Sequence, residues 1–121
     1  MQKKSKNNYE LLITHKVEDT KVFIDSRLDQ QIKGDYILLG EFCEYNNVTF
    51  VINFNSDDNK TIAFEECKFN NCKFLAMSGI SLEFNTCELK NTELEPYDFI
   101  LRYSTLNDKY YTILSQNEIG E

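Results

Sequence analysis

The sequence of 121 residues has few of the residues on which catalysis and phosphate binding commonly depend. It contains a single histidine, His15, no tryptophan and only four glycines. One imidazole with no nucleophile or carboxylate placed beside it is not a catalytic arrangement, so we interpret His15 as an exposed strand residue. Four scattered glycines cannot build a glycine-rich phosphate loop. The sequence therefore argues against an enzyme.

Long apolar segments are also missing. After the basic residues 1–6, the first apolar run is only Leu11, Leu12 and Ile13, which is too short for the core of a signal peptide. No later segment reaches the length needed to span a membrane. We therefore expect a cytoplasmic protein without a membrane partner, whose four cysteines stay reduced.

The charge balance is acidic, with 20 acidic against 13 basic residues and a net charge of −7. This argues against direct nucleic-acid binding, because such proteins present a basic patch. It permits a protein partner with a basic surface, although acidity that serves only solubility is the simpler explanation. The length suits one domain, residues 1–121, with a single modest core. Phe and Tyr dominate the aromatic residues, which favours strands.

A period of five residues is the clearest pattern in the chain. From position 64, every fifth residue is large and apolar except for one glycine: Phe64, Phe69, Phe74, Gly79, Phe84, Leu89 and Leu94. Two residues before each stands an apolar or small residue: Ile62, Cys67, Cys72, Met77, Leu82, Cys87 and Thr92. Neither a helix nor a lone strand has this period. It is typical of short extended segments that turn a corner, bury two residues each and stack as coils.

Several of these units resemble pentapeptide repeats, which consist of a small residue, a polar residue, Leu or Phe, and two polar residues. The units are Cys-Lys-Phe-Asn-Asn at 67–71, Cys-Lys-Phe-Leu-Ala at 72–76, Leu-Glu-Phe-Asn-Thr at 82–86 and Cys-Glu-Leu-Lys-Asn at 87–91. The resemblance covers residues 43–96 when the units at 43–47 and 48–52 are included. It implies a right-handed quadrilateral β-helix with roughly twenty residues per coil.

If a coil holds twenty residues, residues twenty apart should stack. The expected pairs are Phe64 with Phe84, Phe69 with Leu89, Phe74 with Leu94, Ile62 with Leu82 and Cys67 with Cys87, and outside the core Lys68 with Glu88 and Lys73 with Glu93. The units at 43–52 lie one residue out of phase, so the loop at 53–61 must absorb a slip. Gly79, at a large inward position, indicates a kink or bulge.

The flanks do not keep the period. Residues 1–42 contain short β-favouring segments at 9–13, 22–24 and 36–39, which we interpret as strands of an irregular first coil or of a cap over an open end. After Pro96, apolar residues recur at spacings of three, four and five, and Asn107 or Asp108 is a suitable helix N-cap. The fold expected is therefore an all-β, short right-handed β-solenoid at 43–96, with N-terminal strands and a helical C-terminal cap at 97–121, frayed over the last five residues.

Metal sites receive little support. Cys43, Cys67, Cys72 and Cys87 are not spaced as the paired knuckles of structural zinc sites. All four occupy the small inward position of a repeat, where a buried thiol behaves as a small hydrophobe. Asp57 and Asp58 lack the further oxygen ligands of a calcium loop and fit a plain turn. We expect neither a metal nor a cofactor.

Surface acids are the remaining candidates for function. By the stacking scheme, Glu88 and Glu93 are partly neutralised by lysines, whereas Glu65, Glu66, Glu83, Glu95 and Asp98 are not. These five residues would form any acidic partner-binding face. The plain alternative is a solvated acidic exterior.

Two functional hypotheses follow, and an enzyme is a weak third. The first is a non-catalytic protein-binding module, an inhibitor or immunity-type protein that neutralises a partner protein. The second is implied by the resemblance: some pentapeptide-repeat proteins mimic DNA and act on DNA-binding enzymes such as type II topoisomerases. Those proteins are longer, usually dimeric rods, whereas the two or three coils expected here would form only a short stub. Loss of the partner at high salt would favour mimicry, whereas salt-resistant binding would favour the inhibitor.

Overall fold

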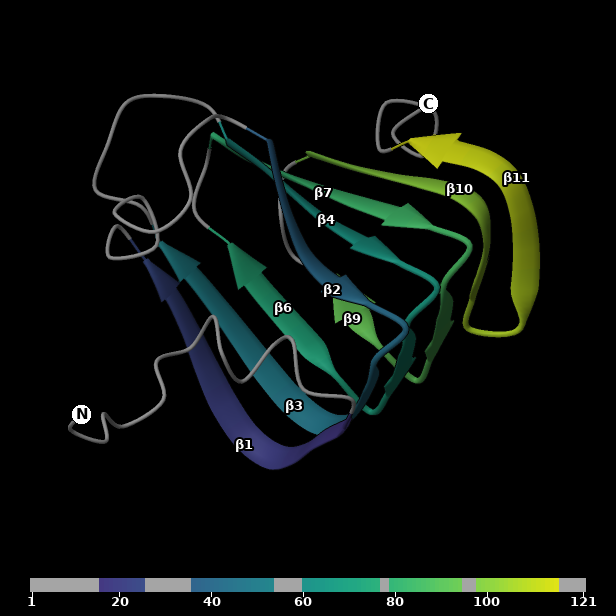
Figure 1. The fold of residues 1–121 in the computed structure, drawn as a ribbon. Helices are drawn as coiled ribbons and strands as arrows, with labels where there is room; N and C mark the ends of the chain where they lie inside the picture. Colours follow the sequence, from purple (N-terminus) through teal and green to yellow (C-terminus); the bar gives the residue numbers. More distant parts are fainter. Residues whose placement is uncertain (1–15, 26–35, 54–59, 77–78, 95–97, 116–121) are drawn as a thin grey trace, which may run out of the picture.

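The computed structural model describes residues 16–25, 36–53, 60–76, 79–94 and 98–115. Within these residues the chain is all-β, with eleven strands and no helix. The strands are β1 (Lys16–Asp25), β2 (Tyr36–Glu41), β3 (Glu44–Asn53), β4 (Lys60–Glu65), β5 (Lys68–Asn70), β6 (Lys73–Ala76), β7 (Ile80–Asn85), β8 (Glu88–Lys90), β9 (Glu93–Leu94), β10 (Asp98–Leu106) and β11 (Lys109–Ser115). Figure 1 shows them wrapped around a common interior.

Parallel pairing arranges the strands in three stacks. Stack A consists of β2, β4, β7 and residues 98–102 of β10. Stack B consists of residues 16–18 of β1, residues 44–46 of β3, β5, β8 and residues 105–106 of β10. Stack C consists of residues 20–25 of β1, residues 48–53 of β3, β6 and β9. Because β1, β3 and β10 each run through two stacks, the sheet bends around the core, an arrangement compatible with a β-solenoid (Figure 1).

The register confirms the stacking expected for the periodic region. Residues twenty apart are partners in all three stacks: Phe64 with Phe84, Ile62 with Leu82, Phe69 with Leu89, Lys68 with Glu88, Phe74 with Leu94 and Lys73 with Glu93. Before this region the offset is 24 residues, as in Tyr45 with Phe69, which agrees with the predicted slip. Residues 54–59 of the loop expected to absorb it lie outside the described part, and its ends belong to β3 and β4. Gly79, where a kink was expected, has a φ of 92°.

Two rows of left-handed residues form the corners between the stacks. The A/B corner is formed by Phe42, Glu66, Thr86 and Tyr103, and the B/C corner by Asp19, Asn47, Asn71 and Asn91. Asn and Asp tolerate this conformation well. In the B/C corner their side chains also pair between strands, since Asn47 Nδ2 donates to Asp19 Oδ1 at 2.8 Å. At the A/B corner, backbone bonds fix the chain: the Glu66 amide donates to the Asn85 carbonyl at 2.9 Å.

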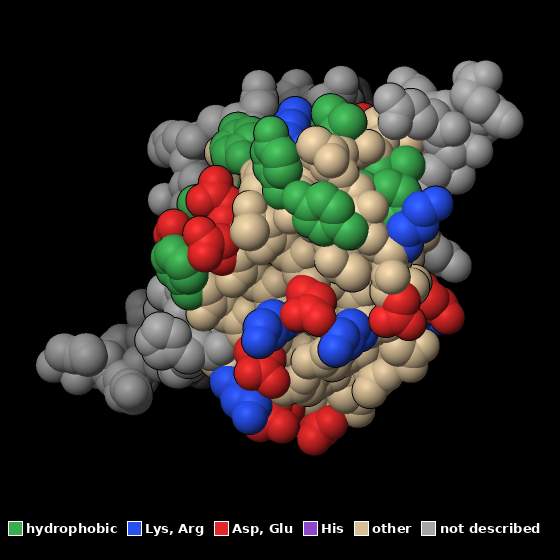
Figure 2. Space-filling model, turned by 90° about the vertical axis from the view of Figure 1, so that its right-hand side faces the viewer, with side chains coloured by type: hydrophobic (Ala, Val, Ile, Leu, Met, Phe, Trp, Pro, Cys, Tyr) green, Lys and Arg blue, Asp and Glu red, His purple; other side chains and the backbone are tan. Residues whose placement is uncertain are grey.

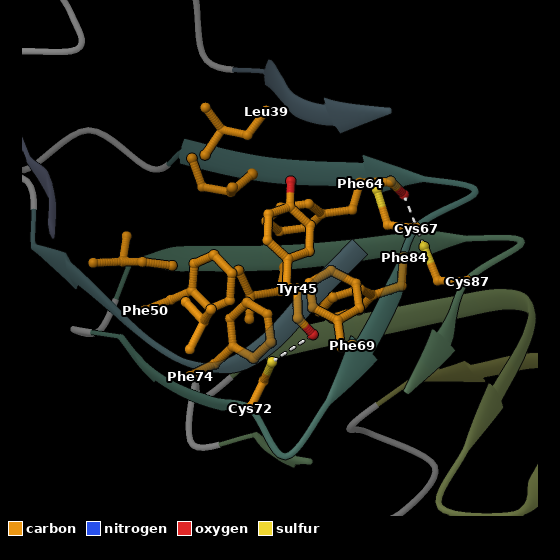
Figure 3. Close-up of a cluster of buried hydrophobic side chains, with 14 of the residues drawn as sticks. Leu39, Tyr45, Phe50, Phe64, Cys67, Phe69, Cys72, Phe74, Phe84 and Cys87 are labelled. Atoms are coloured by element: carbon orange, nitrogen blue, oxygen red, sulfur yellow. Dashed lines mark hydrogen bonds between the residues drawn. The ribbon is translucent and has the colours of Figure 1, made fainter. Parts of the chain in front are cut away.

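The core consists of aromatic columns, one behind each stack. Tyr45 stacks on Phe69 with ring centroids 4.9 Å apart, and Phe50 stacks on Phe74 at 4.4 Å. The columns also meet edge to face, as Phe64 does with Phe69 at 5.1 Å and 88° (Figure 3). All these rings are fully buried. Aromatic contacts of this kind contribute about 0.5–1.5 kcal/mol each beyond the burial of their area.

The four cysteines pack into this core, as expected; all are buried and none forms a disulfide. Each thiol also donates a weak hydrogen bond to a backbone carbonyl, as Cys67 Sγ does to the Glu65 carbonyl at 3.4 Å. Hydroxyls replace thiols in the same role farther along the chain: Thr92 Oγ1 donates to the Lys90 carbonyl, and Ser104 Oγ donates to the Arg102 carbonyl, both at 2.9 Å. Where Cys, Ser or Thr occupies this inward position, the side chain is both compact enough to be buried and able to donate to the backbone.

The prediction of a helical cap at 97–121 is wrong for the described residues, which form the antiparallel hairpin of β10 and β11. Asn107 and Asp108, interpreted as helix N-cap candidates, are its two-residue turn, with φ values of 48° and 78°. The irregular apolar spacing arises because β10 passes the A/B corner at Tyr103. Before the corner the buried residues alternate, at Phe99 and Leu101; after it the next buried residue is Ser104, three positions later. The last five residues, whose fraying was expected, lie outside the described part.

The N-terminal flank supplies strands, as expected for residues 22–24 and 36–39. β1 pairs with β3 and β2 pairs with β4, so both extend the stacks as an irregular first coil would. The segment 9–13, His15 and the pair Asp57–Asp58 lie outside the described residues.

Candidate interaction surface

The structure brings four of the five candidate acids to one side of the molecule. Glu65 on β4, Glu83 on β7 and Asp98 on β10 lie at outward positions of stack A, and Glu66 follows at the A/B corner. Glu66 and Asp98 are exposed, whereas Glu65 and Glu83 are half-buried. Glu95 lies outside the described residues.

Glu83 is not the unneutralised acid that the sequence suggested. Arg102 Nη1 lies 2.7 Å from Glu83 Oε2, and the side chain of Glu83 is only 17% exposed. Asn85 Nδ2 and the Tyr36 hydroxyl donate to the same oxygen at 3.1 and 3.4 Å. The stacking scheme missed Arg102 because β10 pairs with β7 at an offset of 17 residues, which sets Arg102 beside Asn85 and diagonal to Glu83.

This cluster also affects Tyr36. Burial raises the pKa of its hydroxyl, and the negative charge of Glu83 raises it further. The hydroxyl therefore stays protonated and serves Glu83 as a hydrogen-bond donor. Asp98 is likewise engaged, because Ser81 Oγ donates to its Oδ2 at 2.7 Å.

Among the four described candidates, Glu65 and Glu66 are the two whose carboxylates have neither an ion pair nor a side-chain hydrogen bond within the described residues. Neither carboxylate forms an ion pair within the part of the chain that the structure describes. They lie at the end of β4 and at the corner that follows it. Of the five candidates, these two fit an accessible acidic site best.

Stack B has a different surface, on which charges of opposite sign alternate. The outward row runs through Lys16, Glu44, Lys68 and Glu88 on four paired strands. Glu88 also forms an ion pair with Lys90 at 3.3 Å. Figure 2 shows positive and negative side chains side by side over the lower half of this view, with hydrophobic side chains gathered in the upper half. Such alternating charges stabilise the register of the paired strands, but they largely cancel, so this surface has little net electrostatic potential.

Exposed aromatic and aliphatic side chains are the feature that sequence reasoning missed. Phe42 and Tyr103 at the A/B corner are 60% and 58% exposed, and Tyr110 and Ile113 on β11 are 60% and 53% exposed. A signal was available for the first two, because each stands two residues after an inward position, where the repeat places polar residues. Large exposed apolar side chains that cluster commonly mark interaction sites.

A shallow depression of about 270 Å³ lies along the A/B corner. It is lined by Glu66, Cys67, Lys68, Thr86, Cys87, Glu88 and Tyr103. Its two thiols belong to the core, since Cys67 and Cys87 are buried and Cys87 Sγ donates to the Phe64 carbonyl at 3.4 Å. An open depression of this size is below the roughly 300–1,000 Å³ typical of small-molecule pockets. It suits contact with a protein surface better than enclosure of a ligand.

Within the described ranges, no three His, Cys, Asp or Glu side chains are grouped so that they could hold a metal ion. The same part of the chain contains no helix that could cross a membrane. Comparisons with protein-family models, with curated proteins and with solved structures each gave no match to this chain. Functional interpretation therefore depends on its own residues.

Proposed function

We propose that this chain is a right-handed β-solenoid of the pentapeptide-repeat type that acts in the cytoplasm as a non-catalytic protein-binding module, of inhibitor or immunity type. The five-residue period and the twenty-residue register of β4–β9 support the fold assignment. The exposed A/B corner supports the binding role.

The corner is the observation that carries the proposal. Phe42, Glu66, Thr86 and Tyr103 follow one another along it, so two exposed aromatic rings lie at the ends of a row that contains an unpaired carboxylate. A basic side chain of a partner could pair with Glu66 while its neighbours pack on the rings. Aromatic anchors supply most of the binding energy in many protein interfaces.

The backbone beneath this row is held in place before any partner arrives. The Phe42 amide donates to the Glu65 carbonyl at 3.0 Å, and the Thr86 amide donates to the Arg102 carbonyl at 2.8 Å. Because these bonds fix the corner, little conformational entropy is lost when it binds. A preorganised surface of this kind suits tight one-to-one inhibition.

The DNA-mimic alternative has weaker support. Mimicry needs a continuous negative surface, but the outward row of stack B alternates in sign and Arg102 neutralises Glu83. Of the four described candidate acids, those without an ion pair are Glu65, Glu66 and Asp98, and three carboxylates are too few to imitate a phosphate backbone.

A pull-down with the tagged protein from cytosol of the source organism, washed at low and high salt, tests the proposal. The expected result is one partner that survives high salt and is lost with the double variant F42A/Y103A, because the aromatic anchors are removed. The variant F23A, which removes an aromatic ring that is 46% exposed on β1 in stack C, is the matched control. Binding is then repeated with the two purified proteins.

Capture of DNA-binding enzymes that depends on Glu65 and Glu66 and disappears at high salt would instead support mimicry. Equal binding by the wild type and by F42A/Y103A would show that the corner is not the binding site.

A further inference from the structure

The outer edge of β11 is a second candidate interaction site, independent of the proposed function. We propose that β11 pairs antiparallel with β11 of a second copy of this chain, so that the sheet continues across a two-fold axis at Thr112. The proposal depends on the hydrogen-bonding groups of the edge, on its lack of protective features and on its charge.

The hairpin register shows which backbone groups face outward. Leu106 and Lys109 flank the two-residue turn, so they form a hydrogen-bonded pair, and every second pair along the hairpin does the same. Ser104 with Tyr111 is the next such pair, and the alternation along β11 continues through Ile113 to Ser115, although the Arg102 carbonyl accepts from the Thr86 amide at 2.8 Å. The intervening residues Tyr110, Thr112 and Leu114 direct their N–H and C=O groups away from β10.

These groups meet no other strand in the described part of the chain, where β11 pairs with β10 alone. At the right of Figure 1, β11 is the outermost strand and follows β10 along its full length. An open row of donors and acceptors is a template for a further strand.

The edges at the other end of the molecule carry protective features that β11 lacks. β1 has exposed charged side chains at Lys16, Glu18 and Lys21 and a left-handed bend at Asp19. β2 has an irregular register between Leu38 and Gly40. Charges, bends and bulges of this kind discourage pairing between molecules. β11 has no proline and no left-handed residue, and its one charge, Lys109, is next to the turn.

A second copy fits this edge because the strand is self-complementary. Antiparallel pairing about Thr112 sets Tyr110 opposite Leu114 and Lys109 opposite Ser115, so no like charges face each other. The chain carries a net charge of −7, yet β11 contains no acidic residue, so here two acidic copies meet with little repulsion. The exposed side chains of Tyr110 and Ile113 would be partly covered. A two-fold contact closes at a dimer and does not build fibres.

Light scattering coupled to size exclusion, on the full chain from roughly 1 to roughly 500 μM, tests the proposal. We expect a concentration-dependent dimer. T112P removes the outward N–H without touching the bonds to β10, and T112K places like charges against each other at the axis, so each should weaken dimerisation by about tenfold or more. T112A keeps the N–H and is the matched control that should still dimerise.

Hydrogen exchange supplies a readout at the edge itself. The amides of Tyr110, Thr112 and Leu114 should gain protection as the protein concentration rises, whereas the amide of Tyr111, which faces β10, should be protected at every concentration. A chain that stays monomeric over the whole range, or forms open-ended assemblies, overturns the proposal. So does a dimer unaffected by T112K, which decides the matter if T112P fails to fold.

Discussion

The strands from β4 to β9 and the hairpin of β10 and β11 follow different rules within one sheet. In the first region β7, β8 and β9 each pair with the strand twenty residues before, and aromatic rings such as Phe64 and Phe84 stack in register. In the second the offset falls to 17 residues, and the columns end on aliphatic side chains such as Leu101. The periodic region is specified by repetition and core packing, whereas the hairpin depends on one corner and one turn. Substitutions in the two regions should therefore differ in their effect on the free energy of unfolding.

The largest effect is expected for Phe64→Ala in the periodic region. The Phe64 ring contacts the rings of all three columns, with centroids 5.1 Å from Phe69, 5.7 Å from Phe84 and 5.9 Å from Phe74. Loss of such a ring leaves a cavity and costs about 3–5 kcal/mol in the free energy of unfolding. Urea denaturation measures this, with the gentler Phe64→Leu in reserve. The exposed Tyr103→Ala, expected within about 0.5 kcal/mol, is the control; equal costs would contradict the packing.

A smaller effect is expected for Gly40→Ala, at the edge of the periodic region. A Cβ atom at Gly40 would clash with the hydroxyl oxygen of Tyr45 and lie 3.0 Å from Phe64 Cδ1. The overpacking should cost about 1–3 kcal/mol. Tyr45→Phe removes the hydroxyl, so the Gly40→Ala penalty should shrink in that background, as a double-mutant cycle on thermal or urea unfolding would show. Strict additivity would mean that the hydroxyl is not the obstacle.

The sequence predicts the periodic region well because its signal is repeated. The pairing of Phe64, Phe69 and Phe74 with residues twenty positions later follows from the period alone, and so does the burial of the cysteines. The hairpin does not, because its signal is local and occurs once. Tyr103 adds a corner that turns an alternating strand into a pattern of three-residue spacing, which resembles a helix. The pair Asn-Asp at 107–108 suits a type I′ turn as well as an N-cap.

The candidate site was predictable only in part, for the same reason. Glu65 and Glu66 lie in the regular phase, and their outward placement followed from it. The partner of Glu83 was missed because Arg102 lies beyond the change of offset. Phe42 and Tyr103 were missed because each follows an irregular unit, where the assignment of outward positions is weakest. Whether a bulky residue is exposed depends on the folded chain, and the spacing of residues in the sequence does not reveal it.

Asn107→Ala should destabilise the hairpin more than a surface substitution and less than loss of a core ring. The Asn107 side chain bonds both backbone groups of Thr92, the residue before β9: Oδ1 accepts from the Thr92 amide at 3.0 Å, and Nδ2 donates to the Thr92 carbonyl at 3.2 Å. Its loss should cost about 1–3 kcal/mol, since Thr92 is buried. Asn107→Gly removes the same bonds but keeps the left-handed backbone at no strain, so it should cost less than Asn107→Ala. Equal urea midpoints would show that only the bonds matter.

The smallest effects on stability are expected for two ion pairs, one in each region, that join neighbouring strands. Lys73 and Glu93 lie 4.0 Å apart with side chains 47% and 71% exposed. Lys73→Gln should therefore change the free energy of unfolding by about 0.5 kcal/mol or less, and this difference should vanish in molar salt. Arg102 and Glu83 lie 2.7 Å apart with Glu83 largely covered, so Arg102→Gln leaves a poorly solvated carboxylate and should cost about 1–2 kcal/mol with weaker dependence on salt. Urea titrations at low and high salt measure both. If Lys73→Gln proves the more costly, charge pairing supports the periodic region more than its packing suggests.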